Sequence, residues 1–266
     1  MTTTSNNKPP LSRDALRDVN ELALWAGQML LQHGAETARI EQSVHRIGTG
    51  LGCDWLDVLV SPNGLLVTSN SGGEFRTRLR RVTHTGVNMA VLDEISHLTH
   101  RIERGEMNRF EVRAELERID QLTRNYNRWL VAVMVGLACA AFSQLAGGDT
   151  AAFFVTLTAS GAAMLARQEM LHRDFNYLLN VTLTAFVAGL IASAGAMFKL
   201  STTPDAALAS SVLLLVPGVP LINAAEDLIK GHMVIGVVRG LTGVLISLGI
   251  ALGLLLAMSL MGAGTL

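Results

Sequence analysis

The spacing of apolar residues changes near residue 125. Before that point they recur every three or four residues among charged ones, which is typical of amphipathic helices packed on a soluble core. After it they form long runs that are apolar on every side. A helix crosses a bilayer with about 20 mostly apolar residues. The pattern therefore predicts two domains, residues 1–124 and 125–266, built for different solvents.

The first domain, residues 1–124, is predicted to be α+β. Short strands within residues 54–82 are separated by Pro62-Asn63-Gly64 and by Ser71-Gly72-Gly73, which are turn signals. The second of its helices is expected to close at the first glycine of the sequence GTGLG. The expected helices span residues 12–33, 35–48, 88–104 and 109–122.

The second domain, residues 125–266, is predicted to be an all-α membrane bundle of about five transmembrane helices. A buried bundle in a soluble protein is the alternative, but it needs polar faces at helical spacing, which these stretches lack. The last stretch is long enough to tilt or to contain a break. The predicted spans are residues 129–146, 151–166, 178–198, 208–223 and 234–261.

The polar N-terminus, MTTTSNNKPPLSRDAL, lacks the apolar core of a secretory signal, so the first domain is expected in the cytosol. With that start, only Lys199 among the basic residues of the second domain falls outside, as the positive-inside rule requires. An odd number of spans places the C-terminus on the outer, periplasmic side. The basic residues on or near the cytoplasmic side are Arg128, Arg167, Arg173, Lys230 and Arg239.

Charge and motifs narrow the function. The first 124 residues carry 31 charged side chains and the last 142 carry 12, with a net charge of −1, so neither domain has the basic field of a nucleic-acid-binding protein. Cys53 and Cys139 lie in different domains, which predicts no disulfide and no paired-cysteine site. His97 and His100 match no zinc pattern. We therefore expect no metal. Because Walker A, GxGxxG and GxSxG motifs are absent, we also expect no cofactor and no energy from ATP bound by this chain, which leaves ion-coupled or downhill transport.

The fourth predicted span carries the most informative pattern, SSVLLLVPGVPLINAAEDLIKGH. Pro217 and Pro220 each remove a backbone donor inside an apolar stretch, with Gly218 between them, which predicts a break or kink. Interrupted helices at membrane depth are tolerated where they line a cavity, and in transporters they often form the substrate site. A simple proline kink packed against neighbouring helices is the alternative.

Polar residues follow this break. In a helix, Asn223, Asp227 and Lys230 lie on one face, beside Glu226, and ionisable groups near membrane depth are candidates for function. The alternative is a wetted cytoplasmic loop. Arg239 lies in the first turns of the last span, where it can pair with Asp227, reach the interface, or bind a carboxylate.

The order of these parts resembles the threonine/serine exporter family, and more closely the larger subunit of its two-component branch. The resemblance covers nearly the whole chain from about residue 14. It is carried by LLQHGAET, SPNGLLVTS, TGVNM, NRWLVAVMVGLACAAF and SVLLLVPGVPLINAAEDLIKGH. It implies a five-span protein of the bacterial inner membrane that acts with a smaller membrane subunit. The implied substrates are threonine and serine, or dicarboxylates such as succinate, exported by the proton motive force.

The resemblance also suggests site residues. From the proline break beside these ionisable groups, we expect backbone groups of the broken span and Asn223 to bind a substrate carboxylate. Arg239 then supplies charge, and Asp227 or Glu226 takes a proton. Membrane lipid is the other expected partner, and no catalytic residue is expected. Two alternatives are a membrane-anchored enzyme acting on a small metabolite and a purely regulatory first domain that gates a pore. The matching motif residues are Pro217, Gly218, Pro220, Asn223, Asp227, Gly231 and Arg239, with His33, Gly34 and Glu36 as the N-terminal signature.

Overall fold

The computed structural model describes residues 9–83, 86–122 and 126–262. The chain divides into two compact units. The head unit consists of Met1–Thr123 together with Val219–Gly240, and the bundle unit consists of Arg124–Gly218 together with Leu241–Leu266. The predicted assignment of residues 1–124 and 125–266 to two solvents stays a prediction.

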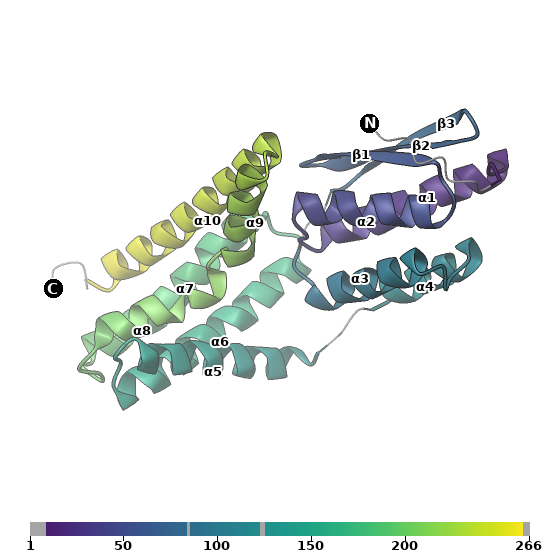
Figure 1. Cartoon of the computed structure of the whole chain (residues 1–266). Coiled ribbons are helices and arrows are strands. Elements are labelled where there is room, and N and C mark those ends of the chain that lie inside the picture. The colour runs from purple at the N-terminus through teal and green to yellow at the C-terminus, as the bar shows by residue number, and fades with distance from the viewer. Residues whose placement is uncertain (1–8, 84–85, 123–125, 263–266) are drawn as a thin grey trace. The chain divides into compact units, whose positions relative to one another are not determined.

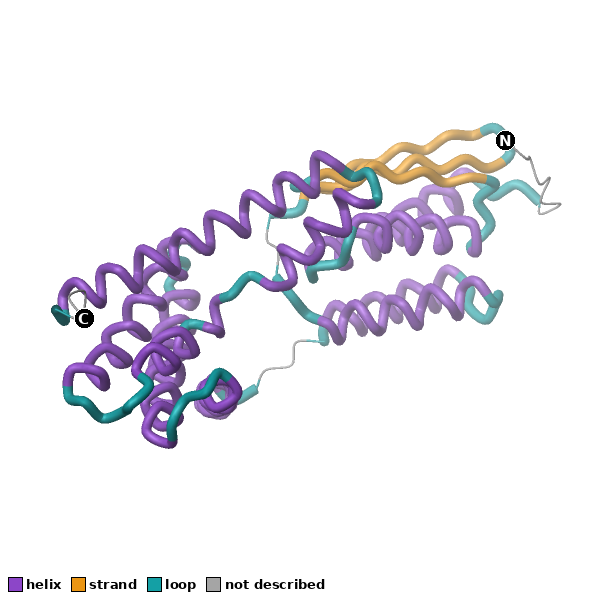
Figure 2. The backbone as a smooth tube through the Cα atoms, turned by 60° about the vertical axis from the view of Figure 1, so that its left-hand side comes forward, coloured by secondary structure: helices purple, strands orange, loops and turns teal. Residues whose placement is uncertain are grey.

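The head unit is an α+β structure in layers. Its three strands form an antiparallel meander in the order β1-β2-β3, side by side in Figure 2. Helices α1 and α2 pack on one face of this sheet, and α3 and α4 lie on the far side of α1 and α2 (Figure 1). The elements before the membrane segments are α1 (Arg13–Gln32), α2 (Thr37–Gly50), β1 (Trp55–Ser61), β2 (Gly64–Ser71), β3 (Glu74–Arg81), α3 (Met89–Glu103) and α4 (Arg109–Asp120).

Local signals explain most of these boundaries. The Ser12 hydroxyl accepts a hydrogen bond from the Ala15 N–H and starts α1. Asn108 starts α4 with a capping box in which the Glu111 carboxylate accepts a hydrogen bond from the Asn108 N–H. The apolar stripes of these helices meet the inner face of the sheet in one core, and Ile235, from the distant C-terminal part of the chain, belongs to that core.

The expected end of α2 was wrong, because the helix runs on to Gly50. A Cβ atom on Gly48 would lie 2.2 Å from Leu56 Cδ1. Gly48 is therefore placed for close contact between α2 and β1, not for stopping the helix. The reversal comes at Gly52, whose φ of +106° is in the region that glycine adopts freely.

The bundle unit contains most of the long apolar helices. Four helices in the described part of the chain are long and apolar enough to cross a membrane, or five if the interrupted pair α8–η1 and α9 counts as one span. Helix α10 runs without a break. The elements are α5 (Arg128–Leu145), α6 (Thr150–His172), α7 (Tyr177–Met197), α8 (Pro204–Ser211), η1 (Leu213–Leu215), α9 (Gly218–Ile229) and α10 (Met233–Leu260), of which α9 and the start of α10 belong to the head unit.

Small residues and loop hydrogen bonds hold the bundle unit together. A Cβ atom on Gly253 of α10 would lie 2.4 Å from the Thr182 carbonyl oxygen of α7, so these helices approach closely at a position where only glycine fits. At one end, the Asp149 carboxylate accepts hydrogen bonds from the Ala152 N–H, the Ser201 hydroxyl and the Thr202 N–H at 2.6, 2.8 and 2.7 Å. Asp149 therefore starts α6 and ties its loop to the loop before α8.

The predicted break in the fourth span is confirmed, but only one proline lies in it. The helix stops after η1, Pro217 occupies the gap, and α9 starts at Gly218. Pro220 sits in the first turn of α9, where a missing N–H loses no hydrogen bond within the helix. The expectation that Pro220 also interrupts the helix was therefore wrong.

Candidate functional site

The site begins at the tight turn between α1 and α2. Gly34 has a φ of +88°, and the Ala35 N–H donates to the Leu30 carbonyl at 3.0 Å, which closes α1. Glu36 occupies the N-cap position of α2, but its side chain makes no capping hydrogen bond. The turn therefore leaves the carbonyls of Gly34 and Ala35 and the N–H of Thr37 to be satisfied from elsewhere.

Asp227 of α9 supplies the missing cap. Its Oδ1 accepts a hydrogen bond from the Thr37 N–H at 2.9 Å, across 190 residues of sequence. The Asp227 side chain is fully buried. A carboxylate at this position completes the first turn of α2 and lies at the positive end of the helix dipole.

Arg239 and Asn223 satisfy the rest of the turn. Arg239 Nη1 lies 2.7 Å from Asp227 Oδ2, and Arg239 Nη2 donates to the Ala35 carbonyl at 2.8 Å. Asn223 Nδ2 donates to the Gly34 carbonyl at 2.7 Å. We call Gly34–Thr37 with Asn223, Asp227 and Arg239 the Asp227 cluster. In it, the turn is bound by side chains from both α9 and α10.

Ion pairs surround the Asp227 cluster at its more exposed edge. Lys230 Nζ lies 2.6 Å from Glu36 Oε2 and 4.0 Å from Glu226 Oε1. The Glu226 carboxyl, and after it the Lys230 ammonium, hold the pKa of Glu36 below its usual range. His232 Nε2 lies 3.6 Å from Glu41 Oε2, and burial raises the pKa of Glu41 against the lowering effect of His232.

One polar atom of the cluster remains unsatisfied. The Thr37 hydroxyl is buried, and it makes no hydrogen bond with the part of the chain that the structure describes. It lies on the residue whose N–H binds Asp227. The cluster therefore has capacity for one more polar group beside the carboxylate.

The structure brings together most of the residues expected at the site. The predicted face of Asn223, Asp227 and Lys230 meets one turn, and Arg239 pairs with Asp227, one of the three arrangements considered. Gly231, with a φ of +88°, forms the reversal between α9 and α10. Their roles in transport stay predictions.

Other expected residues lie apart from the cluster. Pro217 and Gly218 fall in the bundle unit, and Pro220 is in the first turn of α9. His33 ends α1, where burial lowers the pKa of its imidazole against the charge of Asp120. No hydrogen bond from a His33 side chain atom to the cluster occurs among the described residues. No group of three or more His, Cys, Asp or Glu in the described ranges is placed to hold a metal ion.

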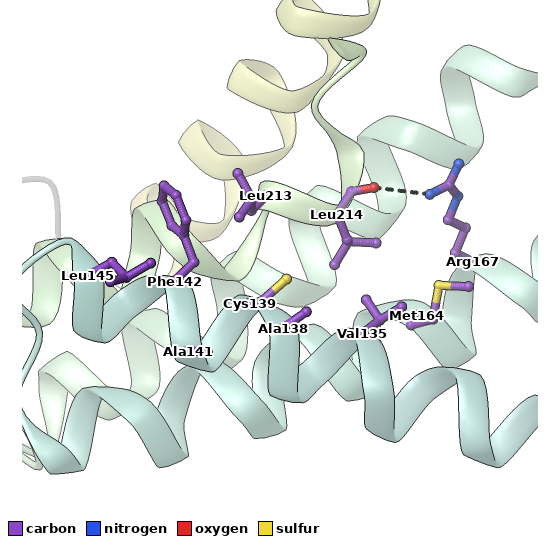
Figure 3. A pocket seen from close by; sticks show the side chains of 10 residues that line it. All are labelled: Val135, Ala138, Cys139, Ala141, Phe142, Leu145, Met164, Arg167, Leu213 and Leu214. Carbon is purple, nitrogen blue, oxygen red and sulfur yellow. Dashed lines mark hydrogen bonds between the residues drawn. The ribbon is translucent and has the colours of Figure 1, made fainter. Parts of the chain in front are cut away.

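The bundle unit has a pocket that is apolar except for one arginine, and the sequence pattern did not identify it as a site. A pocket of about 460 Å³ lies between α5, α6 and η1, and all but one of its lining residues are apolar or Cys139 (Figure 3). The exception is Arg167, whose Nη1 donates to the Leu214 carbonyl at 3.2 Å. In an unbroken helix that carbonyl would accept from the Gly218 N–H, which here donates to Val216. Arg167 therefore satisfies a carbonyl that the break leaves free.

The apolar helices and the interrupted span are typical of a multi-pass membrane protein. The family model described as "Putative threonine/serine exporter" (ThrE) matches residues 21–261, and the chain belongs to that family.

Two relatives are named "Probable succinate transporter subunit YjjP". The protein of Klebsiella aerogenes is 39% identical over 249 residues, which cover 92% of this chain and 95% of the relative. The protein of Escherichia coli (strain K12) is 38% identical over 249 residues, or 92% of this chain and 96% of the relative. An uncharacterized protein of Haemophilus influenzae is 33% identical over 134 residues, or 50% of this chain and 44% of the relative. No solved structure matches the chain.

Proposed function

We propose that this chain is the larger subunit of a two-component exporter that carries small dicarboxylates of the succinate type out across the bacterial inner membrane. Its family and the names of its relatives support an exporter, and "subunit" in those names supports a partner. Threonine and serine are the alternative substrates, from the family description. The observation that carries the proposal is the buried pair of Asp227 and Arg239, which follow the break of the fourth span along the chain.

The chemistry of the Asp227 cluster suits a carboxylate substrate. Arg239 holds one carboxylate and one carbonyl, and a guanidinium binds any carboxylate in the same planar geometry. A substrate carboxylate therefore competes with Asp227 for Arg239. A proton on Asp227 weakens the internal pair and favours the substrate, which gives a physical route from proton uptake to substrate binding.

The same contacts give the head unit a gating role in this proposal. When Arg239 turns to a substrate, the Ala35 carbonyl loses its donor, and loss of Asp227 removes the cap of α2. Substrate binding thus changes the free energy of the α1–α2 turn directly. A ligand shifts a conformational equilibrium only through such differential contacts.

The proposed topology places the head unit in the cytosol and the C-terminus in the periplasm. Arg128 begins α5, Arg173 follows α6, and Lys230 lies between α9 and α10. In the proposed topology these basic groups lie on the cytoplasmic side, in agreement with the positive-inside rule. Lys199, after α7, is then on the outer side. A cysteine reporter introduced beside Lys199 and labelled from outside intact cells tests this arrangement.

Export is tested in cells that lack their own succinate exporter. Three strains are compared at matched protein levels in the membrane. One expresses the chain alone, one expresses the smaller membrane subunit alone, and one expresses both. Cells loaded with succinate or with a threonine dipeptide are followed by the appearance of each solute outside. We expect succinate efflux only when both proteins are present. Threonine efflux instead would correct the substrate, and efflux of neither solute would overturn the proposal.

A further inference from the structure

The sheet of the head unit has one open face. Its inner face, which includes Leu56, Leu65 and Val67, is buried against the helices. On the other face, Leu59, Phe75 and Leu79 are 64%, 66% and 70% exposed. Leu59 on β1 and Leu79 on β3 lie on either side of the half-buried Leu66 on β2, so these apolar side chains form a contiguous patch, and such patches on folded domains mark interaction sites. The side chains of the open face are Trp55, Asp57, Leu59, Ser61, Leu66, Thr68, Asn70, Phe75, Thr77, Leu79 and Arg81.

The strand register arranges these side chains in rows across the sheet. Leu59, Leu66 and Leu79 are direct partners on β1, β2 and β3, so they form one row of leucines. Trp55 and Phe75 flank Asn70 in a second row. Each row therefore has large apolar groups at both ends.

The other two rows carry the charges of the face. Asp57 shares a row with Thr77, and Ser61 shares a row with Arg81. Each charged residue thus has a hydroxyl-bearing residue at the opposite end of its own row. No row of the described sheet has a charge at both ends.

We propose that this open face binds the same face of a second copy of the chain, about a two-fold axis parallel to the strands. That axis places β1 of one copy over β3 of the other, at the same level along the strands. Leu59 then lies over Leu79 and Trp55 over Phe75, while Asp57 meets Thr77. A two-fold axis perpendicular to the strands that passes between the two middle rows would instead place Asp57 over Leu59, with no compensating charge.

The charges also argue against a lipid surface as the occupant. Cytoplasmic membrane surfaces are anionic and attract clusters of basic residues, whereas this face carries one basic residue, Arg81, and one acidic residue, Asp57, and so has no net positive charge. A second copy meets that carboxylate with the Thr77 hydroxyl and brings no like charge to it. The pattern of the face is therefore complementary to itself.

The interface between the two copies buries a small area, so it is expected to form only where the copies are concentrated. Three strands about 4.8 Å apart and seven residues of about 3.4 Å each give roughly 340 Å² per copy, or roughly 700 Å² for both. Specific complexes between freely diffusing proteins usually bury at least about 1,200 Å². Confinement of both copies to one membrane raises their effective concentration, so we expect association in the membrane and dissociation on dilution in detergent.

Cysteine cross-linking in native membranes tests both the occupant and the axis. Packed sheets lie about 10 Å apart, so a short bis-maleimide bridges residues that face each other. Leu66→Cys, near the axis, is expected to link to itself. Leu59→Cys and Leu79→Cys, on differently tagged copies of the full chain, are expected to link to each other and not to themselves. Phe110→Cys, on α4 at 65% exposure, is the matched control and should give no dimer.

The native cysteines, Cys53 and Cys139, are buried. The wild-type chain, treated with the same reagent, gives the background level of cross-linking from these two residues. Adding Leu79→Asp to the Leu66→Cys chain should lower the cross-linked fraction roughly tenfold, because two apolar contacts are lost in each dimer. Dimer yields at Leu66 no higher than at Phe110, with normal protein levels, would overturn the proposal. So would cross-linking of Leu66→Cys to the smaller subunit in place of a second copy, or stronger linkage of Leu59 to itself than to Leu79. None of these readouts depends on the transported solute.

Discussion

Replacing Asp227 by asparagine tests whether the Asp227 cluster is a single energetic unit. Asparagine keeps the size of the side chain and an oxygen that can accept from the Thr37 N–H, but it removes the negative charge beside Arg239. Removing one partner of a buried ion pair costs about 3–5 kcal/mol. The Arg239 side chain is 17% exposed, so water recovers part of its hydration, and we expect about 3 kcal/mol.

The assay is the free energy of unfolding of the purified full chain in detergent, followed by tryptophan fluorescence in a denaturant series. Asp18→Asn is the matched control, because Asp18 pairs with Arg113 where the two side chains are 23% and 37% exposed. Exposed pairs contribute about 1 kcal/mol or less. A loss for Asp227→Asn no larger than for Asp18→Asn would refute the buried-pair reasoning.

A double-mutant cycle separates the pair from the rest of the cluster. Arg239→Gln removes the charge that Asp227→Asn leaves unpaired, so the double variant should be more stable than the sum of the single losses predicts. Contacting charged pairs show coupling of about 0.5–3 kcal/mol in such cycles. Zero coupling would mean that Asp227 and Arg239 act separately and that a substrate carboxylate does not exchange with Asp227.

Three further changes have expected outcomes. Gly34→Ala should lower the free energy of unfolding by about 1–2 kcal/mol because of its positive φ, and by more because its Cβ would lie 3.0 Å from a backbone oxygen. Gly73→Ala is the control in the same unfolding assay: its φ is similar and its surroundings are open, so it should show the backbone cost alone. Burial lowers the pKa of His33, so as the pH falls below about 6.5 the unfolded chain takes up a proton before the folded chain does, and the folded state loses stability. His33→Gln should flatten this pH dependence of the free energy of unfolding, measured from pH 7.5 to 5. Asp149→Ala should lower the thermal midpoint, because it loses the hydrogen bonds that join two loops, while Asp205→Ala should change it little; equal midpoints would contradict the role of Asp149.

The sequence predicts helices and strands well where the signals are local. Local signals place α1, α2, α3 and α4 within two residues of their observed ends, and the two turn sequences separate three strands. The errors concern the roles assigned to Gly48 in α2 and to Pro220. A glycine can serve packing or helix termination, and only the contact of Gly48 with Leu56 decides which. A proline can break a helix or begin one, and only the start of α9 at Gly218 shows that Pro220 is near a beginning.

The candidate site was predictable in its charged members and not in its backbone members. The pairing of Asp227 with Arg239 was one of several arrangements that the spacing allowed. The turn binds these side chains through the carbonyls of Gly34 and Ala35 and the N–H of Thr37. Nearly every residue has these backbone groups, so the sequence gives no direct signal of which ones form the site. The one available signal was negative: α2 begins after Glu36 without a capping side chain of its own.

The cap of α2 also sets an order of events during synthesis. Chains are made from the N-terminus, and early segments fold as they emerge. The Thr37 N–H has no Asp227 carboxylate to bind, and the core of the head unit lacks Ile235, until those residues are synthesised. The head unit is therefore completed only after α5 to α8 have left the ribosome. Helices α5 to α8 are therefore available for membrane insertion before the head unit can be completed. A fragment that ends at residue 124 lacks both contributions, and a self-sufficient version of the head unit needs residues 219–240 joined to it.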